Sequence, residues 1–600
     1  MAMTARPESV QTRPDAGTAP SQAPRLAVLG HPAFWLALLL AAFVVHVLHL
    51  ACVAEDAFIT FRFARHVADG HGFVWNIGEP PIEGYTGFLW LLLSAAASKA
   101  GLDLPRTAQV VGTLAGCGTL LLAYLAGRRL CGWPPPIAVV PAVLLAAAGP
   151  FATWAASGME TVPFTLFAFA GLCAFAAYWR RAQGARDDRA DRRAGEGHGG
   201  GSGGGAALTW MSLLLVLASL TRPEGVMVFG TLFGLSVLFA AGDGRGRART
   251  HARAHAVALG VFVALFGAYF AWRWQYFGDL LPNTYYAKTG GGIYQVARGV
   301  LLSIYFAFQF VTPLVPWVLV ALWDATAGPA PRASLGGIVA ALRQHALLAG
   351  SAVVCAVFTL YVVAVGGDYM AMHRFFVPIL PPMYLLAAAC LAALVPREGM
   401  APRRWAAVAA LVMVSVLATL VHSTRAEKQL FVKPPQQHGN FQGVRIERWH
   451  VARLSLIGRF FRDHRRSADE SLATSAIGAI GYYSDMKVLD FHGLVDRHIA
   501  RTAVPDIKRM GRAGHQKTDF PYLFAKSPTY IMLTRELTPE PADLRRFSPP
   551  GVWELVAGDY EPRSVWLTDT VNGEAGYFTF LARRGAPPPD VAPAASPGSR

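Results

Sequence analysis

The 600-residue sequence has few charged residues and few cysteines. Asp, Glu, Lys and Arg together make up only 15% of the chain, whereas 53% is hydrophobic, and the mean hydropathy is +0.35. Such a composition excludes an ordinary soluble protein. The six cysteines all lie in or beside apolar runs, so they form neither a disulfide framework nor a metal-binding CxxC pattern. We expect them to be packing residues.

Several catalytic motifs are also absent. The sequence has no Walker loop, no HExxH, no GxSxG and no βαβ unit carrying GxGxxG. The net charge of +16 does not indicate nucleic acid as a partner, because the arginines lie in short loops between apolar runs and not on one soluble face. Their placement is typical of the cytoplasmic loops of a membrane protein.

Apolar runs dominate what is present. A membrane-spanning helix needs roughly 20 apolar residues. We identify eleven such runs: 33–53, 107–127, 136–152, 160–179, 207–221, 225–241, 256–277, 299–323, 345–365, 375–395 and 404–421. The first is not a signal peptide, because it is long, lacks a small-residue cleavage site and precedes further spans. We predict a mainly α, polytopic membrane protein of about 11 transmembrane helices with a C-terminal extracytoplasmic α/β domain.

Four arginine-rich loops set the predicted topology. Residues 127–132, 180–197, 244–250 and 396–404 should be cytoplasmic, which places the N-terminus inside and the C-terminus outside. Residues 87–101 are apolar, but counting them as a span would move these loops outside. We therefore expect a re-entrant or interfacial helix there.

The chain divides into four predicted regions. They are a disordered cytoplasmic N-terminus (1–30), a transmembrane domain (31–421) with an outward loop (54–106), a periplasmic α/β domain (422–584) and a disordered tail (585–600). The inside loop 180–206 is also predicted to be disordered because it is rich in Gly and Arg. In the α/β domain we expect a strand, turn and helix within 472–484, and strands within 487–493 and 528–534.

The first outward loop begins with two carboxylates. "EDAFITFRFARHVADGHG" starts at Glu55, and Ile59, Phe63 and Val67 share one face of the helix that should follow Asp56. We expect this helix to lie on the outer membrane surface with its Arg and His side chains on the other faces. Asp56 is either an N-cap of this helix or a functional carboxylate, and residue type alone leaves both open.

Other outward loops carry further polar side chains. They are Glu160, Arg222, Asn283, Tyr285, Lys288, Asp368, His373 and Arg374. Each has a structural alternative: a carboxylate at a helix start, an ion pair between Arg222 and Glu224, aromatic anchoring at the interface, or snorkelling. Together they suit group transfer from a lipid phosphate, in which cations offset the phosphate charge and a carboxylate takes a proton from the acceptor.

The ordered motifs "EDAFITFRFARHVADGHGFVWNIGEPPIEGYTGFLW", "SGMET", "LTRPEG", "GDLLPNTYYAK" and "GGDYMAMHRFFVPILPP" resemble the GT-C class of glycosyltransferases that use polyprenyl-phosphate sugars. Within that class they are similar to the bacterial terminal arabinofuranosyltransferase family. The resemblance implies a catalytic acid at Asp56 with Glu55 beside it, and a lipid-phosphate site that includes Lys288 and Arg374. We group the remaining polar residues of the outward loops with that site: Arg222, Asn283, Tyr285, Glu160, Asp368 and His373.

The resemblance extends into the C-terminal domain. "TSAIGAIGYYSDMKVLDFHGLVD" and "GHQKTDFPYL" are similar to the family's periplasmic domain, which makes His492, Asp496, His515 and Lys517 candidates for acceptor contact. The alternative is that both histidines only make hydrogen bonds within the folded domain. Many relatives begin the first loop with two aspartates. Glu55 departs from that pattern and argues against tight metal coordination, so the sequence assigns no cofactor and leaves a divalent metal open.

We therefore expect a multi-pass glycosyltransferase of the bacterial inner membrane, acting in the cell envelope. It would transfer a sugar, such as arabinofuranose or another pentose or hexose, from a polyprenyl-phosphate donor to an extracytoplasmic glycan, lipid or protein. Its partners would include the bilayer but no nucleic acid. The alternative is a transporter or flippase of a lipid-linked sugar, which should carry ionisable residues at midplane and inverted repeats. Here the acids lie at the ends of spans and no repeat is visible.

Overall fold

The structure is a computed structural model that describes residues 32–193, 204–243, 247–326, 335–368, 370, 372–394, 401–428, 443–504 and 514–586. The predicted disordered segments 1–30 and 585–600 lie outside these ranges, except for residues 585 and 586. The inside loop 180–206 is described in part, and its first residues are helical because α9 (Thr161–Arg193) continues through them.

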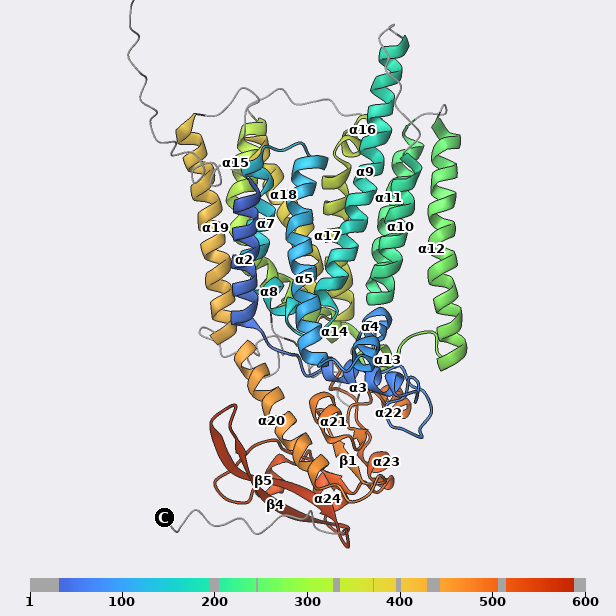
Figure 1. Ribbon diagram of the computed structural model, residues 1–600, viewed down its shortest axis with the longest axis vertical. Helices are drawn as coiled ribbons and strands as arrows, with labels where there is room; N and C mark the ends of the chain where they lie inside the picture. Colours follow the sequence, from blue (N-terminus) through green and yellow to red (C-terminus); the bar gives the residue numbers. More distant parts are fainter. Residues whose placement is uncertain are drawn as a thin grey trace, which may run out of the picture.

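A bundle of long helices forms one end of the molecule (Figure 1). Besides α9 it contains α2 (Pro32–Leu50), α5 (Leu104–Leu125) with η1 (Ala126–Leu130), α6 (Pro135–Ala138), α7 (Val140–Ala147), α8 (Gly149–Ala155), α10 (Gly204–Thr221), α11 (Glu224–Ala241), α12 (Ala248–Phe277), α14 (Gly292–Phe306), η3 (Ala307–Val311), η4 (Thr312–Leu314), α15 (Val315–Thr326), α16 (Leu335–Gln344), α17 (Ala346–Val365), η5 (Arg374–Ile379), α18 (Leu380–Ala393) and α19 (Pro402–Lys428).

Each of the eleven apolar runs corresponds to one helix or to several consecutive helices. Among the described residues, nine helices are long and apolar enough to cross a membrane. A tenth candidate is the pair 135–147 and 149–155, which is bent by 66°. Pro150 lies in the first turn of α8 and has no N–H with which to continue the preceding helix. The run 207–221 forms α10, whose apolar part, Gly205–Thr221, is shorter than the others.

Three short helices lie between the bundle and the C-terminal domain: α3 (Ala57–Ala68), α4 (Phe88–Lys99) and α13 (Asn283–Lys288) (Figure 1). With 12 residues, α4 is too short to span, which agrees with the interfacial helix predicted at 87–101. One feature of α3 was not predicted. Its polar side is covered by the C-terminal domain, and Arg62, only 5% exposed, donates hydrogen bonds to the carbonyls of Gly481 and Met486. An apolar face in the sequence does not tell what covers the opposite face.

The C-terminal domain is α/β, as predicted. It contains α20 (Val444–Asp463), β1 (Ser471–Thr474), α21 (Gly478–Ser484), β2 (Lys487–Asp490), α22 (Arg497–Arg501), α23 (Phe520–Ala525), β3 (Tyr530–Ile531), η6 (Leu544–Phe547), α24 (Val552–Val556), β4 (Tyr560–Asp569) and β5 (Glu574–Arg583). The sheet has the order β2-β1-β3-β5-β4, in which β1 is parallel to β2 and β3, and β5 is antiparallel to β3 and β4. The three predicted strands are β1, β2 and β3, whereas the β4–β5 hairpin was not anticipated.

The C-terminal domain is joined to the end of the bundle by a shared core and by hydrogen bonds. Phe58 and Phe61 of α3 belong to the same buried hydrophobic cluster as Ile457 of α20 and Ile480 of α21. Arg448 of α20 also donates to the carbonyl oxygen of Ala51, over 2.7 Å, just after α2 ends. The loop that carries Glu55 and Asp56 is therefore held from both sides.

Candidate functional site

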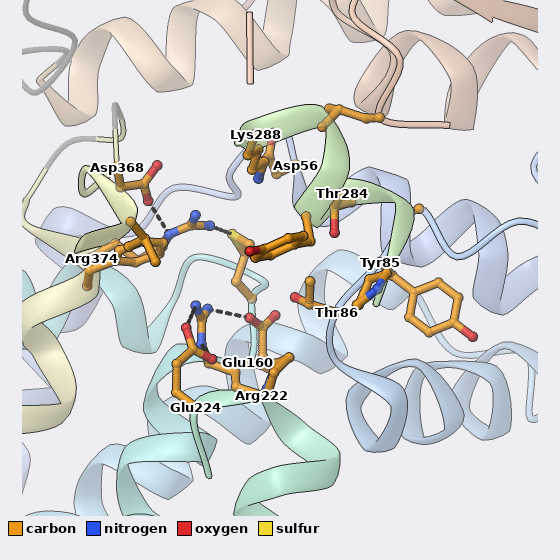
Figure 2. A pocket seen from close by; sticks show the side chains of 18 of the residues that line it. Asp56, Tyr85, Thr86, Glu160, Arg222, Glu224, Thr284, Lys288, Asp368 and Arg374 are labelled. Atoms are coloured by element: carbon orange, nitrogen blue, oxygen red, sulfur yellow. Dashed lines mark hydrogen bonds and ion pairs between the residues drawn. The ribbon is translucent and has the colours of Figure 1, made fainter. Parts of the chain in front are cut away.

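A cavity of about 210 Å³ lies where the bundle meets the C-terminal domain. It is lined by residues of α3, the turn before α4, the start of α9, the turn between α10 and α11, α13, the end of α17 and η5, and by Leu494 of the C-terminal domain. Figure 2 shows that its polar side chains come from segments far apart in the sequence. Of the predicted residues, the cavity brings together Asp56, Glu160, Arg222, Tyr285, Lys288, Asp368 and Arg374.

Asp56 stands immediately before α3, at the N-cap position. Its backbone has helical dihedrals (φ −61°, ψ −25°) and its side chain makes no capping hydrogen bond. An N-cap residue ordinarily has extended dihedrals and accepts a hydrogen bond from the second or third N–H of the helix. The geometry thus does not support the purely structural alternative, and the Asp56 side chain lines the cavity instead.

Arg222 is held by two carboxylates in the turn between α10 and α11. Its Nη1 lies 2.7 Å from Glu160 Oε1 and its Nη2 lies 2.7 Å from Glu224 Oε1. The hydroxyl of Tyr361 donates to the same Glu224 oxygen over 3.1 Å. The expected ion pair of Arg222 and Glu224 is present, and Glu160, 62 residues earlier in the chain than Arg222, forms a second ion pair with the same arginine. The resulting group is buried and formally carries one negative charge.

Arg374 forms a second buried ion pair, with Asp368. Its Nη1 donates to the sulfur of Met159 over 3.2 Å, and its guanidinium lies over the ring of Trp154, 5.6 Å from the centroid. The preceding residue, His373, has a left-handed backbone (φ 47°) and directs its side chain elsewhere. His373 contacts Gln309 Oε1 through Nε2, over 2.7 Å, and does not line the cavity.

Lys288 ends α13 and lines the cavity without a partner of its own. Its ammonium makes no hydrogen bond or ion pair with any other residue in the part of the chain that the structure describes. Tyr285, one turn earlier, also lines the cavity and is 47% exposed. Asn283 does not reach it, because its amide nitrogen donates to the carbonyls of Gly493 and Leu494 over 2.9 Å each. Asn283 thereby fixes α13 against the C-terminal domain.

Glu55 is directed away from Asp56 and from the cavity. Its Oε1 accepts hydrogen bonds from the backbone N–H groups of Gly478 (2.5 Å) and Ala479 (3.2 Å), at the start of α21. Burial, together with the nearby carboxylates of Asp56 and Glu447, raises the pKa of Glu55 to about 8. The structure therefore gives Glu55 a place in the contact between domains, although its sequence position suggested a second acid beside Asp56.

The four C-terminal candidates do not line the cavity. Asp496 caps α22, accepting from the backbone N–H groups of His498 (2.9 Å) and Ile499 (3.1 Å). Lys517 donates from Nζ to two backbone carbonyls, those of Tyr286 (2.8 Å) and Ala500 (2.9 Å).

The two histidine candidates lie beside each other. The ring centroids of His492 and His515 are 4.7 Å apart. Burial lowers the pKa of His492 to about 4, so its imidazole is neutral at pH 7. The loop that carries His492 nevertheless contributes Leu494 to the cavity.

Sequence reasoning missed the neutral lining of the cavity. Thr60, Tyr85, Thr86, Thr284 and Tyr361 were not singled out, although most lie within the motifs quoted above. Their signal was their position beside charged candidates, because hydroxyl side chains carry no distinctive spacing. Within the described residues, no group of three or more His, Cys, Asp or Glu side chains is arranged to hold a metal ion.

Comparisons with known proteins identify the fold. Residues 442–581 match the family "Domain of unknown function (DUF8728)". No curated protein sequence matches the chain. The structure of ArnT from Cupriavidus metallidurans bound to undecaprenyl phosphate aligns with a TM-score of 0.52 and 14% identity, covering 92% of this chain and 99% of ArnT. The apo structure of the same protein aligns with a TM-score of 0.52 and 13% identity, covering 92% and 98%. The chain thus has the GT-C fold, with its C-terminal α/β domain set against one end of the helical bundle.

Proposed function

We propose that this protein is a membrane glycosyltransferase that takes a sugar from a polyprenyl-phosphate donor. The observation that carries the proposal is the cavity in which the Asp56 carboxylate and the Lys288 ammonium lie together, at the junction of bundle and C-terminal domain. A lipid-linked donor and a water-borne acceptor can meet at such a junction, because one side of it faces the bilayer and the other the aqueous domain.

Lys288 is the first candidate for the donor phosphate. Its ammonium has no carboxylate partner among the described residues, so it is available to an anion. Arg374 and Arg222 would contribute from fixed positions, since their ion pairs hold each guanidinium at the cavity wall. The similarity in fold to ArnT, whose structure contains undecaprenyl phosphate, supports a lipid phosphate as the ligand.

Asp56 is the proposed general base. It would take the proton from an acceptor hydroxyl while that oxygen attacks the anomeric carbon of the donor sugar. The bond between the anomeric carbon and the phosphate oxygen breaks, and polyprenyl phosphate leaves with its charge offset by Lys288. The other cavity carboxylates, Glu160, Glu224 and Asp368, are engaged with arginines.

The orientation in the membrane follows from the arginines. Arg247 donates to the carbonyl oxygen of Ala182, and Arg343 pairs with Asp243, so basic residues of several helices gather at the end of the bundle opposite the C-terminal domain (Figure 1). By the positive-inside rule that end faces the cytoplasm. The C-terminal domain and the cavity would then be extracytoplasmic, on the periplasmic side of a bacterial inner membrane.

The sugar and the acceptor are proposed from the motif resemblance. It favours a pentofuranose such as arabinofuranose, and an extracytoplasmic glycan, lipid or protein as acceptor. The C-terminal domain would present the acceptor, since its residue Leu494 reaches the cavity. Transport of a lipid-linked sugar is the second candidate function. No specific feature of the described cavity favours it, because the charged groups of the cavity lie at the end of the bundle.

The test is incubation of the purified protein with a panel of undecaprenyl-phosphate sugars and with candidate acceptor glycans. We expect release of undecaprenyl phosphate from at least one donor, and loss of that release in Asp56→Asn. Binding of these donors without release of undecaprenyl phosphate from any of them would reject the enzyme and favour transport.

A further inference from the structure

Three threonine hydroxyls line one side of the cavity. Thr60 belongs to α3, Thr86 to the turn before α4, and Thr284 to α13. In the described ranges none of the three hydroxyls makes a hydrogen bond with another residue. Three unrelated segments thus bring neutral donor and acceptor groups to the same cavity as Asp56 and Lys288.

Thr284 is the most informative of the three. Its side chain is buried, with 6% of the residue exposed, and its hydroxyl has no hydrogen-bond partner among the residues that the structure describes. Several threonines inside the described helices donate to the carbonyl four residues earlier, as Thr113 does to Gln109 and Thr231 to Met227.

Thr284 cannot make this bond, because it is the second residue of α13 and residue 280 lies before the helix. A buried hydroxyl without a hydrogen-bond partner is unfavourable unless a ligand or a water molecule forms a hydrogen bond with it.

Among the described residues that line the cavity, Tyr85 also has a neutral hydroxyl that is buried without a hydrogen-bond partner, but this hydroxyl lies apart from the threonines. Its ring packs against Phe63, with centroids 5.2 Å apart, and against Phe73. Figure 2 shows its hydroxyl directed away from the other labelled side chains, whereas the hydroxyl of Thr284 lies on the side of Thr86 and Glu160. We therefore assign the three threonine hydroxyls, and not the hydroxyl of Tyr85, to a molecule in the cavity.

The charges around these hydroxyls limit what they can bind. Glu160 is paired with Arg222, and Asp368 with Arg374, so neither is available to a substrate ammonium without breaking an ion pair. Lys288 is needed for the donor phosphate. Asp56, which also lines the cavity, is assigned to the proton of the acceptor. In this assignment no charge of the described lining is left to pair with an amino or carboxyl substituent of the sugar.

We propose that Thr284, with Thr60 and Thr86, forms the subsite for the glycosyl group of the donor, and that this group is an uncharged sugar recognised through its hydroxyls. The inference rests on the proposed function, since it names the part of the same cavity that holds the sugar while Lys288 holds the phosphate.

The test compares binding of undecaprenyl phosphate with binding of undecaprenyl phosphate that carries arabinofuranose, using the full chain in lipid nanodiscs. Thr284→Val removes the hydroxyl at nearly constant volume, and Thr284→Ser keeps it. Thr113→Val is the matched control, because it removes a hydroxyl that is bonded within α5 and lies outside the cavity.

We expect the wild type to bind the sugar-bearing lipid more tightly than the bare lipid. Thr284→Val should reduce that preference roughly tenfold, as expected for one lost hydrogen bond with a partner left unpaired. Its affinity for undecaprenyl phosphate should stay unchanged, and Thr284→Ser and Thr113→Val should behave as the wild type.

Three results would overturn the subsite. They are an equal affinity of the wild type for both lipids, an equal loss for both lipids in Thr284→Val, and tighter binding of an amino-substituted pentose donor than of the neutral one. The assay measures binding and needs no turnover. Failure of the proposed subsite can therefore be distinguished from failure of the proposed glycosyltransferase activity. A Thr284-dependent preference without release of undecaprenyl phosphate would support the subsite and reject the glycosyltransferase.

Discussion

The carboxylate of Glu55 accepts a hydrogen bond from the backbone N–H of Gly478 over 2.5 Å, although 423 residues separate the two in the chain. The contact is too close for any side chain at position 478, since a Cβ there would lie 2.1 Å from the carbonyl oxygen of Glu55 and 2.8 Å from its Oε1. It fixes α21 against the residue next to Asp56, so the C-terminal domain holds the proposed base in place.

Gly478→Ala should therefore destabilise the protein. The added methyl group must push the Glu55 backbone aside, and overpacking of this kind typically costs about 1–3 kcal/mol. Thermal unfolding of the detergent-solubilised protein measures the effect. Gly230→Ala is the matched control, because a Cβ at Gly230 in α11 meets nothing within 4 Å. Equal melting temperatures for the two variants would show that the junction tolerates displacement.

Stability should fall as the pH rises from about 5 to about 8. Burial raises the pKa of Glu55 to about 8, and that of Glu447 to about 7, above the ordinary value of 4.5. Between pH 4.5 and these values the folded state binds more protons than the unfolded state, so raising the pH favours unfolding. The stabilisation is fully present below pH 4.5 and is lost as the pH passes through the raised pKa values.

Glu55→Gln tests this dependence, because glutamine does not titrate. Melting temperatures between pH 5 and pH 8 should show a shallower decline in Glu55→Gln than in the wild type. Glu554→Gln, at an exposed position of α24, should keep the wild-type slope. If the slopes of all three proteins coincide, Glu55 does not change its protonation in this range.

Asp56→Asn should reduce the rate of sugar transfer by on the order of 10²–10⁴, the usual contribution of a general base. Asparagine caps helices about as well as aspartate, so folding and donor binding should be retained. Single-turnover kinetics with a donor accepted by the wild type provide the measurement. Glu55→Gln should lower the rate less, and a larger loss there than in Asp56→Asn would mean that Asp56 is not the base.

Lys288→Ala should weaken binding of undecaprenyl phosphate, because it removes a cavity cation that has no carboxylate partner among the described residues. Arg374→Lys should weaken it too, since a point charge cannot replace the planar group that contacts both Asp368 and Met159. Lys99→Ala, at an exposed position of α4, is the control. Unchanged affinity in both cavity variants would assign these cations to the membrane interface alone.

Reporter fusions test the proposed orientation. A reporter active only in the periplasm should be silent after residue 195 and active after residue 430, because the arginine-rich ends of the helices should face the cytoplasm. The reverse pattern would contradict the topology and would place the cavity on the wrong side for an extracytoplasmic acceptor.

The sequence predicted the architecture well because membrane spans depend on local composition. A run such as 345–365 is apolar over the thickness of a bilayer, and the structure has α17 there. The interfacial helix at 87–101 followed from topology alone. The ordered motifs also indicated the GT-C fold, and the structure together with the comparisons confirms that fold class.

Whether the sequence placed a candidate residue correctly depended on where the partners of that residue lie in the chain. Arg222, Lys288, Asp368 and Arg374 sit at helix ends that converge on one cavity, so their outward positions were enough to group them. Glu55 and Asn283 are also polar residues of the outward loops, yet the side chain of each forms hydrogen bonds with the backbone of the C-terminal domain. No local pattern distinguishes a carboxylate that binds a ligand from one that binds a distant N–H group.

The sequence by itself therefore determined the membrane spans, the α/β character of the C-terminal domain and the end of the bundle at which polar residues gather, because hydrophobic length and periodicity are local properties. Only the tertiary structure decided that Asp56 faces the cavity while Glu55 faces α21, and that the buried hydroxyl of Thr284 has no partner within the described part of the chain. Those outcomes depend on side-chain direction and on contacts between residues hundreds of positions apart, which packing of the two domains sets.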